Sequence, residues 1–134
     1  MYTGSCLCGA VEVEVTGAIG SIIHCHCSLC RKSSGTAYAT NGFVASAEFR
    51  IAKGASKLKA YVFKPGRERH FCSDCGSPVY SSNADNPDYI RIRLGILNDD
   101  ICERPMSHNF VTSRANWDDL DAELPRYDEF EPGR

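Results

Sequence analysis

The stretch "FCSDCG", residues 71–76, places two cysteines three positions apart and follows them with a glycine. A second stretch, "SCLCG" at residues 5–9, repeats this arrangement with its cysteines two positions apart. Such pairs are typical of zinc knuckles, in which a turn directs two sulfurs at one metal ion and the glycine lets backbone N–H groups approach a thiolate. Four thiolates complete a closed tetrahedral site, so we expect a structural zinc ion held by Cys6, Cys8, Cys72 and Cys75.

This predicted site joins the N-terminal strand to a hairpin more than sixty residues later, which links metal affinity to folding. Two alternatives are a redox-active pair at Cys72 and Cys75, or ordinary free thiols. The redox motif normally opens a helix in an α/β unit, whereas the sequence around Cys72 has the pattern of a strand. The two paired spacings together therefore favour zinc.

The sequence on either side of these motifs predicts a mainly β fold. "AVEVEV", residues 10–15, alternates small or apolar residues with acidic ones, which is typical of a strand with one solvated face. "SLCRKSSG", residues 28–35, predicts a tight turn or a single helical turn that ends at Gly35. Further strands are expected within residues 22–27, 43–54, 58–66, 67–72, 77–82 and 88–97, each rich in β-branched or aromatic residues. Helices should be few or short.

The length of 134 residues and the 43% content of hydrophobic residues predict one domain, residues 1–134, with a sizeable core. A short helical turn is expected from Trp117 to Leu120, and residues 128–134 are expected to form a polar tail. The N-terminus lacks the basic start and apolar run of a signal peptide, and no apolar stretch is long enough to span a membrane. We therefore expect a cytoplasmic protein without a membrane partner.

The net charge and the cysteine content limit the classes of function that the sequence favours. A formal net charge of -2 produces no global field that favours nucleic acid, so a nucleic-acid partner is not expected. Eight cysteines in a reducing compartment indicate metal binding or thiol chemistry more than disulfides, because they are clustered.

A second metal site is predicted in "CHCSLC", residues 25–30. Cys25, Cys27 and Cys30 supply three thiolates, and three protein ligands with one open position are the pattern of a catalytic zinc site. Three alternatives remain at this point: Cys102 completes a closed site, His24 or His26 is the fourth ligand, or two of the thiols form a disulfide. In an extended segment His26 points to the face opposite the cysteines, which favours a packing role.

Basic residues near this trio are candidates for substrate contacts. Arg31 and Lys32 follow Cys30 directly, and their charges would favour thiolates and could bind the carboxylates of an anionic thiol such as glutathione. A solvated basic turn is an equally good interpretation of these two residues. "KPGRERH", residues 64–70, is also basic enough for an anion site, but its pattern favours a turn followed by a solvated strand face.

The ordered motifs "GSCLCGAVEVEV", "CHCSLCRKSSG" and "FCSDCGSPVY", with a late tryptophan followed by "LPRY", resemble those of the glutathione-dependent formaldehyde-activating enzyme family, which shares its domain with a centromere-protein branch. The resemblance covers residues 4 to about 127. It implies antiparallel sheets like those of a zinc-containing chaperone of small GTPases. It also implies two zinc ions per chain, a structural one at Cys6, Cys8, Cys72 and Cys75 and a catalytic one at Cys25, Cys27 and Cys30.

The reaction that the resemblance implies joins glutathione and formaldehyde to give S-(hydroxymethyl)glutathione, formally a carbon–sulfur lyase working in the synthetic direction. Either the metal binds the thiol as a thiolate or it polarises the aldehyde oxygen, and the sequence does not choose between these. Two other functions are considered: a binding module in which both metals are structural, and a thiol–disulfide redox protein. The sequence leaves the aldehyde, the thiol and the oligomeric state open.

Overall fold

The computed structural model describes residues 1–119 and 123–134, and Leu120, the end of the expected late helical turn, lies outside them. Ten strands dominate the described part of the chain: β1 (Tyr2–Ser5), β2 (Glu12–Val15), β3 (Gly20–Cys25), β4 (Ala39–Ala45), β5 (Phe49–Lys53), β6 (Leu58–Lys64), β7 (Arg67–Cys72), β8 (Pro78–Asn83), β9 (Tyr89–Arg93) and β10 (Ser107–Asn109). The helices are α1 (Ser28–Ser34) and four single 3₁₀ turns, η1 (Ser46–Glu48), η2 (Ala55–Lys57), η3 (Leu94–Ile96) and η4 (Val111–Ser113). The mainly β prediction is confirmed.

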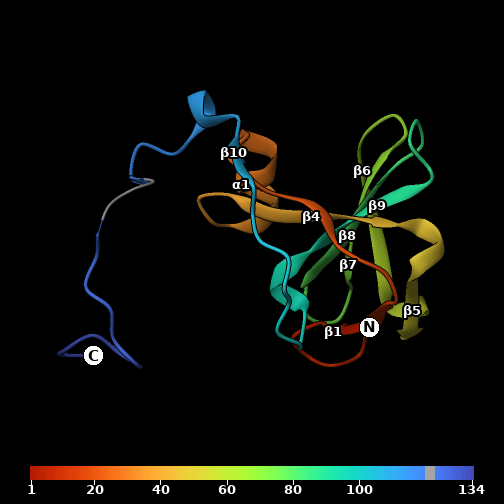
Figure 1. Ribbon diagram of the computed structural model, residues 1–134, viewed down its shortest axis with the longest axis horizontal. Coiled ribbons are helices and arrows are strands. Elements are labelled where there is room, and N and C mark those ends of the chain that lie inside the picture. The colour runs from red at the N-terminus through yellow and green to blue at the C-terminus, as the bar shows by residue number, and fades with distance from the viewer. Residues whose placement is uncertain (120–122) are drawn as a thin grey trace.

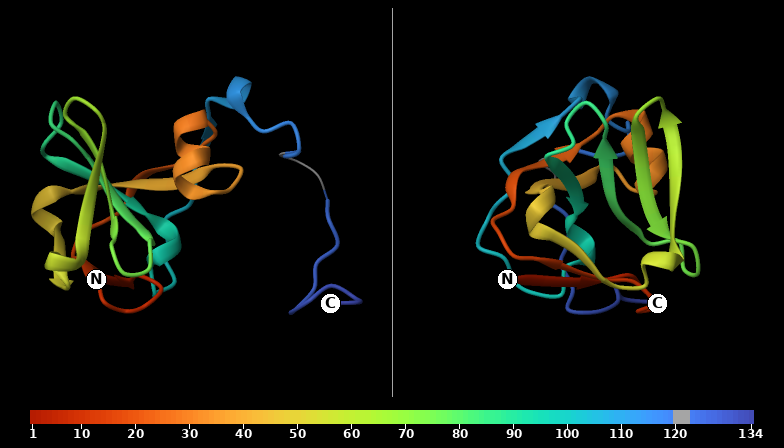
Figure 2. Two further views of the ribbon diagram at one scale, coloured as in Figure 1. Left: turned by 180° about the vertical axis from the view of Figure 1, so that it is seen from behind. Right: turned by 90° about the vertical axis from the view of Figure 1, so that its right-hand side faces the viewer.

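The strands form two sheets. A three-stranded sheet has the order β1-β2-β5, and a seven-stranded sheet has the order β10-β3-β4-β9-β8-β7-β6. Neighbouring strands are antiparallel, except that β10 runs parallel to β3. Figure 1 shows α1 and β10 on the side of the sheets opposite β5, and both views of Figure 2 place the N-terminal strand far from that helix.

Residues 43–54, expected as one strand region, are divided between the two sheets. The break is η1, where Ser46 donates from its backbone N–H to Asp88 (2.8 Å) and from its hydroxyl to Pro87 (2.7 Å). These bonds end β4 at Ala45 and let the chain turn into β5 of the smaller sheet. The short strands β1 and β10 were not expected from the sequence, because neither carries a clear alternating pattern.

The main core consists of buried side chains from both sheets, and its fully buried members include Val11, Val13, Val15, Val44, Val79 and Ile92. Successive side chains of a strand point to opposite faces, so the residues between these core positions face outward. On the seven-stranded sheet that outward face carries polar and charged side chains, which line the cavity described below.

Helix α1 begins and ends at residues with local hydrogen-bonding roles. The sulfur of Cys27 accepts the backbone N–H of Cys30 (3.3 Å) at the N-terminus of the helix. Gly35 ends the helix with φ of 71° and donates its N–H to Arg31 (2.8 Å). The expected single helical turn ending at Gly35 is thus a two-turn helix with the expected end.

At the other end of the chain, residues 128–134 are exposed and belong to no helix or strand. Among the described residues no helix has the length and apolar character needed to cross a bilayer.

Candidate metal centres and the cavity beside them

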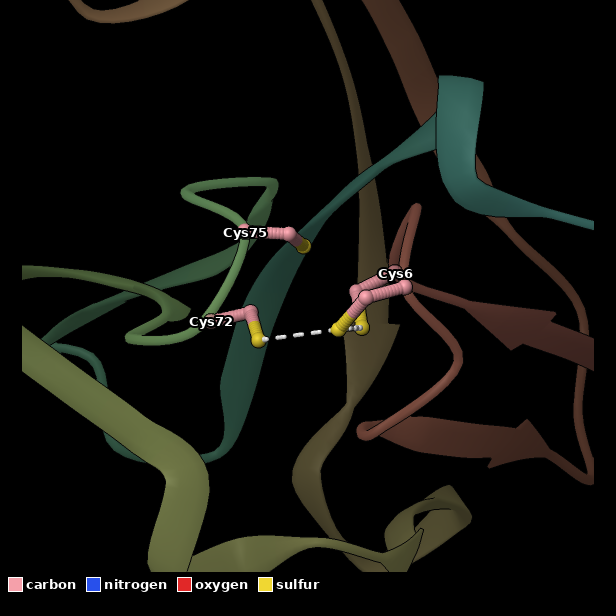
Figure 3. Close-up of side chains that lie close together, drawn as sticks. Cys6, Cys72 and Cys75 are labelled. Atoms are coloured by element: carbon pink, nitrogen blue, oxygen red, sulfur yellow. Dashed lines mark hydrogen bonds between the residues drawn. The ribbon is translucent and has the colours of Figure 1, made fainter.

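The sulfurs of Cys6, Cys8, Cys72 and Cys75 lie within 4.8 Å of one another. The Sγ–Sγ distance is 3.6 Å between Cys6 and Cys8 and 3.9 Å between Cys8 and Cys72. A tetrahedral zinc ion with zinc–sulfur bonds of about 2.3 Å requires neighbouring sulfurs about 3.8 Å apart, so the donor set and its spacing fit zinc. Figure 3 shows Cys72 and Cys75 pointing from one loop towards Cys6.

Both cysteine pairs sit on the same kind of turn. Gly9 and Gly76 have φ of 79° and 78°, and their N–H groups donate to the carbonyls of Cys6 (3.1 Å) and Cys72 (2.8 Å). This backbone conformation is readily available only to glycine, which explains the glycine after each pair. The turns bend each pair so that both sulfurs face one point, as the sequence predicted.

Local donors stabilise negative charge on these sulfurs. The N–H of Val11 donates to Cys6 Sγ (3.2 Å), and Ser77 Oγ lies 3.2 Å from Cys75 Sγ. The hydrogen bond from the Ser77 side chain is the main reason that the pKa of Cys75 falls to about 5. A thiolate is the form that binds metal, so the lowered pKa of Cys75 favours metal binding at this cluster.

The second cluster brings together the sulfurs of Cys25, Cys27 and Cys30, again within 4.8 Å. Cys25 ends β3, Cys27 precedes α1, and Cys30 lies in the first turn of that helix. Among the described residues, no histidine, cysteine, aspartate or glutamate places a further ligand atom within that distance of all three sulfurs. The arrangement matches a metal site with an open position.

The residues considered as a fourth ligand have other contacts. Cys102 is exposed and lies 3.6 Å from the hydroxyl of Tyr2. His24 bonds to the hydroxyl of Thr40 (2.9 Å), and His26 bonds to His108 (2.9 Å). All eight cysteines are free thiols, so no disulfide links members of the trio.

The pKa values of Cys25 and Cys27 shift in opposite directions. Desolvation raises the pKa of Cys25 to about 12. At Cys27 burial acts in the same direction, but hydrogen bonds from the backbone and thiol of Cys30 outweigh it and lower the pKa. Of these two thiols, the protein therefore favours the thiolate form at Cys27.

The trio opens into a cavity of about 700 Å³ that is lined by both cationic and apolar side chains. Its charged lining residues are Lys64, Arg67, Arg69, Arg91 and Arg93, and among the residues that the structure describes no aspartate or glutamate lines it. Asn41, Ser81 and Asn109 add neutral polar groups. The cavity combines thiol ligands with a binding surface for an anion.

Strand register explains why the arginines meet. Arg91 of β9 pairs with Ser81 of β8, which pairs with Arg69 of β7, so the three lie in one row across the sheet. Arg93 pairs with Asn41 of β4 on the neighbouring row. In the sequence, Arg67 and Arg69 flank Glu68, and Arg91 and Arg93 flank Ile92. Residues two apart in a strand lie on the same face, so this spacing was the signal in the sequence that the arginines share a face.

The turn followed by a strand that was expected within residues 64–70 is present, with the turn at residues 65–66 and β7 after it. Arg67 and Arg69 are partly exposed, and both line the cavity beside the trio. Their guanidinium carbons lie 5.6 Å and 4.6 Å from the ring centroid of Phe63, a cation–π arrangement that holds them at the cavity wall. The anion-site alternative for this segment remains a prediction.

Burial and the nearby positive charges lower the pKa of two of these arginines. Arg93 is buried, and desolvation together with the charge of Arg69 lowers its pKa to about 10. Desolvation also lowers the pKa of Arg91, with a contribution from the neighbouring charge of Arg67. Anionic groups that enter the cavity would relieve this repulsion.

Arg31 and Lys32 lie apart from most of this surface. Both line a small cavity of about 210 Å³ with Trp117, whose side chain is 69% exposed. Lys32 also lines a neighbouring apolar cavity, but neither residue lines the cavity of the trio. Their assignment as glutathione contacts remains a prediction. The arginines that do line the cavity of the trio are Arg67, Arg69, Arg91 and Arg93.

His26 packs as expected, and His70 is packed as well. His26 is fully buried, and its Nδ1 lies 4.0 Å from Asp118 while its Nε2 bonds to His108. His70 stacks on Tyr80 with ring centroids 4.1 Å apart and bonds to Ser82 (3.0 Å). Through His26, the segment between Cys25 and Cys27 is fixed to the late part of the chain.

Comparison with known proteins agrees with this geometry. The family model described as glutathione-dependent formaldehyde-activating enzyme matches residues 1–113. A Halomonas elongata protein given that name provisionally is 29% identical in an alignment of 131 positions that covers 91% of this chain and 82% of that protein. A Fusarium vanettenii protein with the same provisional name is 33% identical in an alignment of 78 positions that covers 56% of this chain and 41% of that protein.

A solved structure has the same architecture. The crystal structure of a Rhodobacter sphaeroides protein superposes with a TM-score of 0.65 at 26% identity, covering 80% of this chain and 99% of that one. Together with the match of the family model over most of its length, this shows that the chain belongs to the glutathione-dependent formaldehyde-activating enzyme family.

Proposed function

We propose that this protein joins a small anionic thiol, glutathione above all, to an aldehyde, giving S-(hydroxymethyl)glutathione when the aldehyde is formaldehyde. In enzyme classification this is a carbon–sulfur lyase acting in the synthetic direction. One observation carries the proposal: Cys25, Cys27 and Cys30 line the same cavity as five cationic side chains, with no acidic lining residue in the described part of the chain. Glutathione is a thiol with two carboxylates, so its sulfur and its charges match the two parts of this cavity.

Two zinc ions per chain are part of the proposal. The four-cysteine cluster would hold a structural ion, and Cys25, Cys27 and Cys30 would hold the other. Bound by the trio, zinc would supply an open coordination position and favour the thiolate form of a thiol there, or polarise an aldehyde oxygen. Eight free cysteines suit a reducing compartment, so we place the protein in the cytoplasm.

The chain's own residues would bind and orient the substrate. Arg67 and Arg91 offer guanidinium groups that can bind carboxylates by paired hydrogen bonds. Arg69 Nη2 lies 3.9 Å from Cys30 Sγ, so its charge lies beside the thiol trio, where the sulfur of glutathione would react. Holding thiol and aldehyde together removes the entropic cost of their encounter, which is the main acceleration we expect because the addition also proceeds unaided.

A binding module with two structural metals is the competing function. It requires closed coordination at both clusters, whereas among the described residues only three ligand atoms meet at the second one. The arginine-lined cavity also gives a small anion a place to bind. Both observations support the enzyme.

The test measures the exchange rate between ¹³C-formaldehyde and S-(hydroxymethyl)glutathione by NMR exchange spectroscopy, with zinc-loaded protein. We expect the wild type to accelerate exchange and Cys27→Ser to abolish the acceleration with the fold intact by circular dichroism. Cys102→Ser, which alters an exposed cysteine outside both clusters, is the control and should match the wild type. Wild-type exchange no faster than the buffer rate, or full acceleration by Cys27→Ser, would contradict the proposal.

A further inference from the structure

A second cavity lies directly against the cavity of the trio. It has a volume of about 470 Å³. Leu29, Phe63, Arg69 and Arg93 line both cavities, so the two share a wall. Leu29 stands between Cys27 and Cys30 in the sequence, which places the shared wall next to the thiols.

The two cavities differ in chemical character. The second one is lined by the aromatic residues Tyr61, Phe63, Phe71 and Tyr80, together with Leu29 and Pro78. Its cations, Lys32, Arg69 and Arg93, are fewer than those around the trio. Tyr61 pairs with Arg69 across β6 and β7, which continues the row of Arg91 and Ser81 towards the sheet edge. Phe43 pairs with Arg91 at the other end of the row, so an aromatic residue flanks the cations on each side, and Tyr61 is the one that lines the second cavity.

Glutathione does not account for the apolar wall of the second cavity. Its carboxylates, ammonium group and peptide groups need hydrogen-bonding partners, which the cations of the two cavities can offer and the phenylalanine, leucine and proline side chains of this wall cannot. Formaldehyde does not account for it either, because its carbon carries only hydrogens. A cavity of roughly 150 Å³ is enough for benzene, so about 470 Å³ has room for an aromatic ring with a substituent.

We infer that the second cavity binds the ring of an aromatic aldehyde, which this protein joins to glutathione. This inference rests on the proposed function and names the class of its second substrate. In the reaction the aldehyde carbon forms a bond to the glutathione sulfur, and the thiol proton ends on the aldehyde oxygen. The product is a thiohemiacetal, and no oxidant or reductant is needed. Aromatic side chains at the wall favour an aromatic ring through offset or edge-to-face contacts.

Stable analogues of the two products test the inference by binding. S-benzylglutathione carries the ring of the benzaldehyde adduct, and S-methylglutathione carries only the single carbon of the formaldehyde adduct. Isothermal titration of the full zinc-loaded chain gives the dissociation constant of each. We expect S-benzylglutathione to bind at least about tenfold more tightly, because its ring is removed from water.

A wall variant assigns that preference to the second cavity. Tyr61 is 57% exposed, so Tyr61→Ala should leave the fold intact while removing one aromatic wall, and we expect it to lower the preference at least threefold. Tyr89→Ala is the matched control, because Tyr89 is 47% exposed and lines a different cavity. It should retain the wild-type preference.

The outcomes separate the inference from the function on which it rests. Equal affinities for the two analogues, or a preference that Tyr61→Ala leaves unchanged, would overturn the aromatic-aldehyde inference while the formaldehyde exchange test still stands. No binding of glutathione or of either analogue would overturn the proposed function and the inference together. Faster thiohemiacetal formation from benzaldehyde by the wild type than by Tyr61→Ala would support the inference in turnover.

Discussion

The guanidinium of Arg69 lies 3.9 Å from the sulfur of Cys30, although 39 residues separate them in the chain. Arg69 also lies over the ring of Phe63 and lines both cavities beside the trio. It is thus the residue at which the thiol cluster, the cationic wall and the aromatic wall meet. Its position makes it the first target for mutagenesis.

Arg69→Gln should weaken glutathione binding by about tenfold or more, because hydrogen bonds to charged groups contribute roughly 1.5–3 kcal/mol each. Arg69→Lys should recover part of the loss, since it restores the charge without the planar fork. The measurement is the dissociation constant from isothermal titration at two salt concentrations. Arg50→Gln is the control, because Arg50 pairs with Glu14 on the smaller sheet. Equal affinities of Arg69→Gln and the wild type would show that glutathione binds elsewhere.

The two cysteine clusters should respond differently to loss of a ligand. Cys72→Ser should lower the thermal stability strongly and change the circular dichroism spectrum, because its cluster joins segments distant in the chain. Cys27→Ser should remove one zinc ion per chain by native mass spectrometry and leave the spectrum unchanged. Cys102→Ser should retain both ions. A Cys72→Ser protein as stable as the wild type would contradict a structural role for that cluster.

Gly54 should tolerate no side chain. It has φ of 79°, and a Cβ built on it overlaps the backbone carbonyl of Ala10, next to the turn that carries Cys8. We expect Gly54→Ala to lower the free energy of unfolding by at least about 3 kcal/mol. Gly35 also has positive φ, but a Cβ there meets no described atom within 4 Å, so Gly35→Ala should lose only about 1–2 kcal/mol. Urea unfolding measures the free energy of unfolding of both variants. A similar decrease in the two would contradict the steric argument.

The hydrogen bonds between Asp99 and Thr3 of β1 should make the stability of the fold depend on pH in the acidic range. Hydrogen bonds from the backbone N–H and hydroxyl of Thr3 lower the pKa of Asp99 below its ordinary value of 3.8. The unfolded chain therefore binds the proton first, so this stabilisation is complete above the ordinary pKa and is lost as the pH falls through the lowered one. Melting temperatures of the wild type and Asp99→Asn should differ at pH 6 and converge near pH 2. A constant difference across that range would contradict the assignment.

Several features were predictable from the sequence because their causes are local. The glycine after each cysteine pair fixes a turn within a few residues, so Cys6 with Cys8 and Cys72 with Cys75 could be expected to bend towards a metal. The end of α1 at Gly35 was predictable for the same reason. The strands β1 and β10 were missed because they are short and lack alternation, and only pairing with β2 and β3 defines them.

The sequence by itself determined the mainly β architecture, the close cysteine pairs and trio, and the glycine turns, since strand patterns, cysteine spacings and turn glycines are each local to short segments. Only the tertiary structure decided that Arg69 and Arg91 share a row with Ser81, and that Tyr61 continues this row into an aromatic cavity. Cross-strand register is set by pairing between distant segments, whose hydrogen bonds and core contacts no local pattern records. The thiol clusters could therefore be predicted from the sequence, whereas the surface proposed to bind the substrate could not.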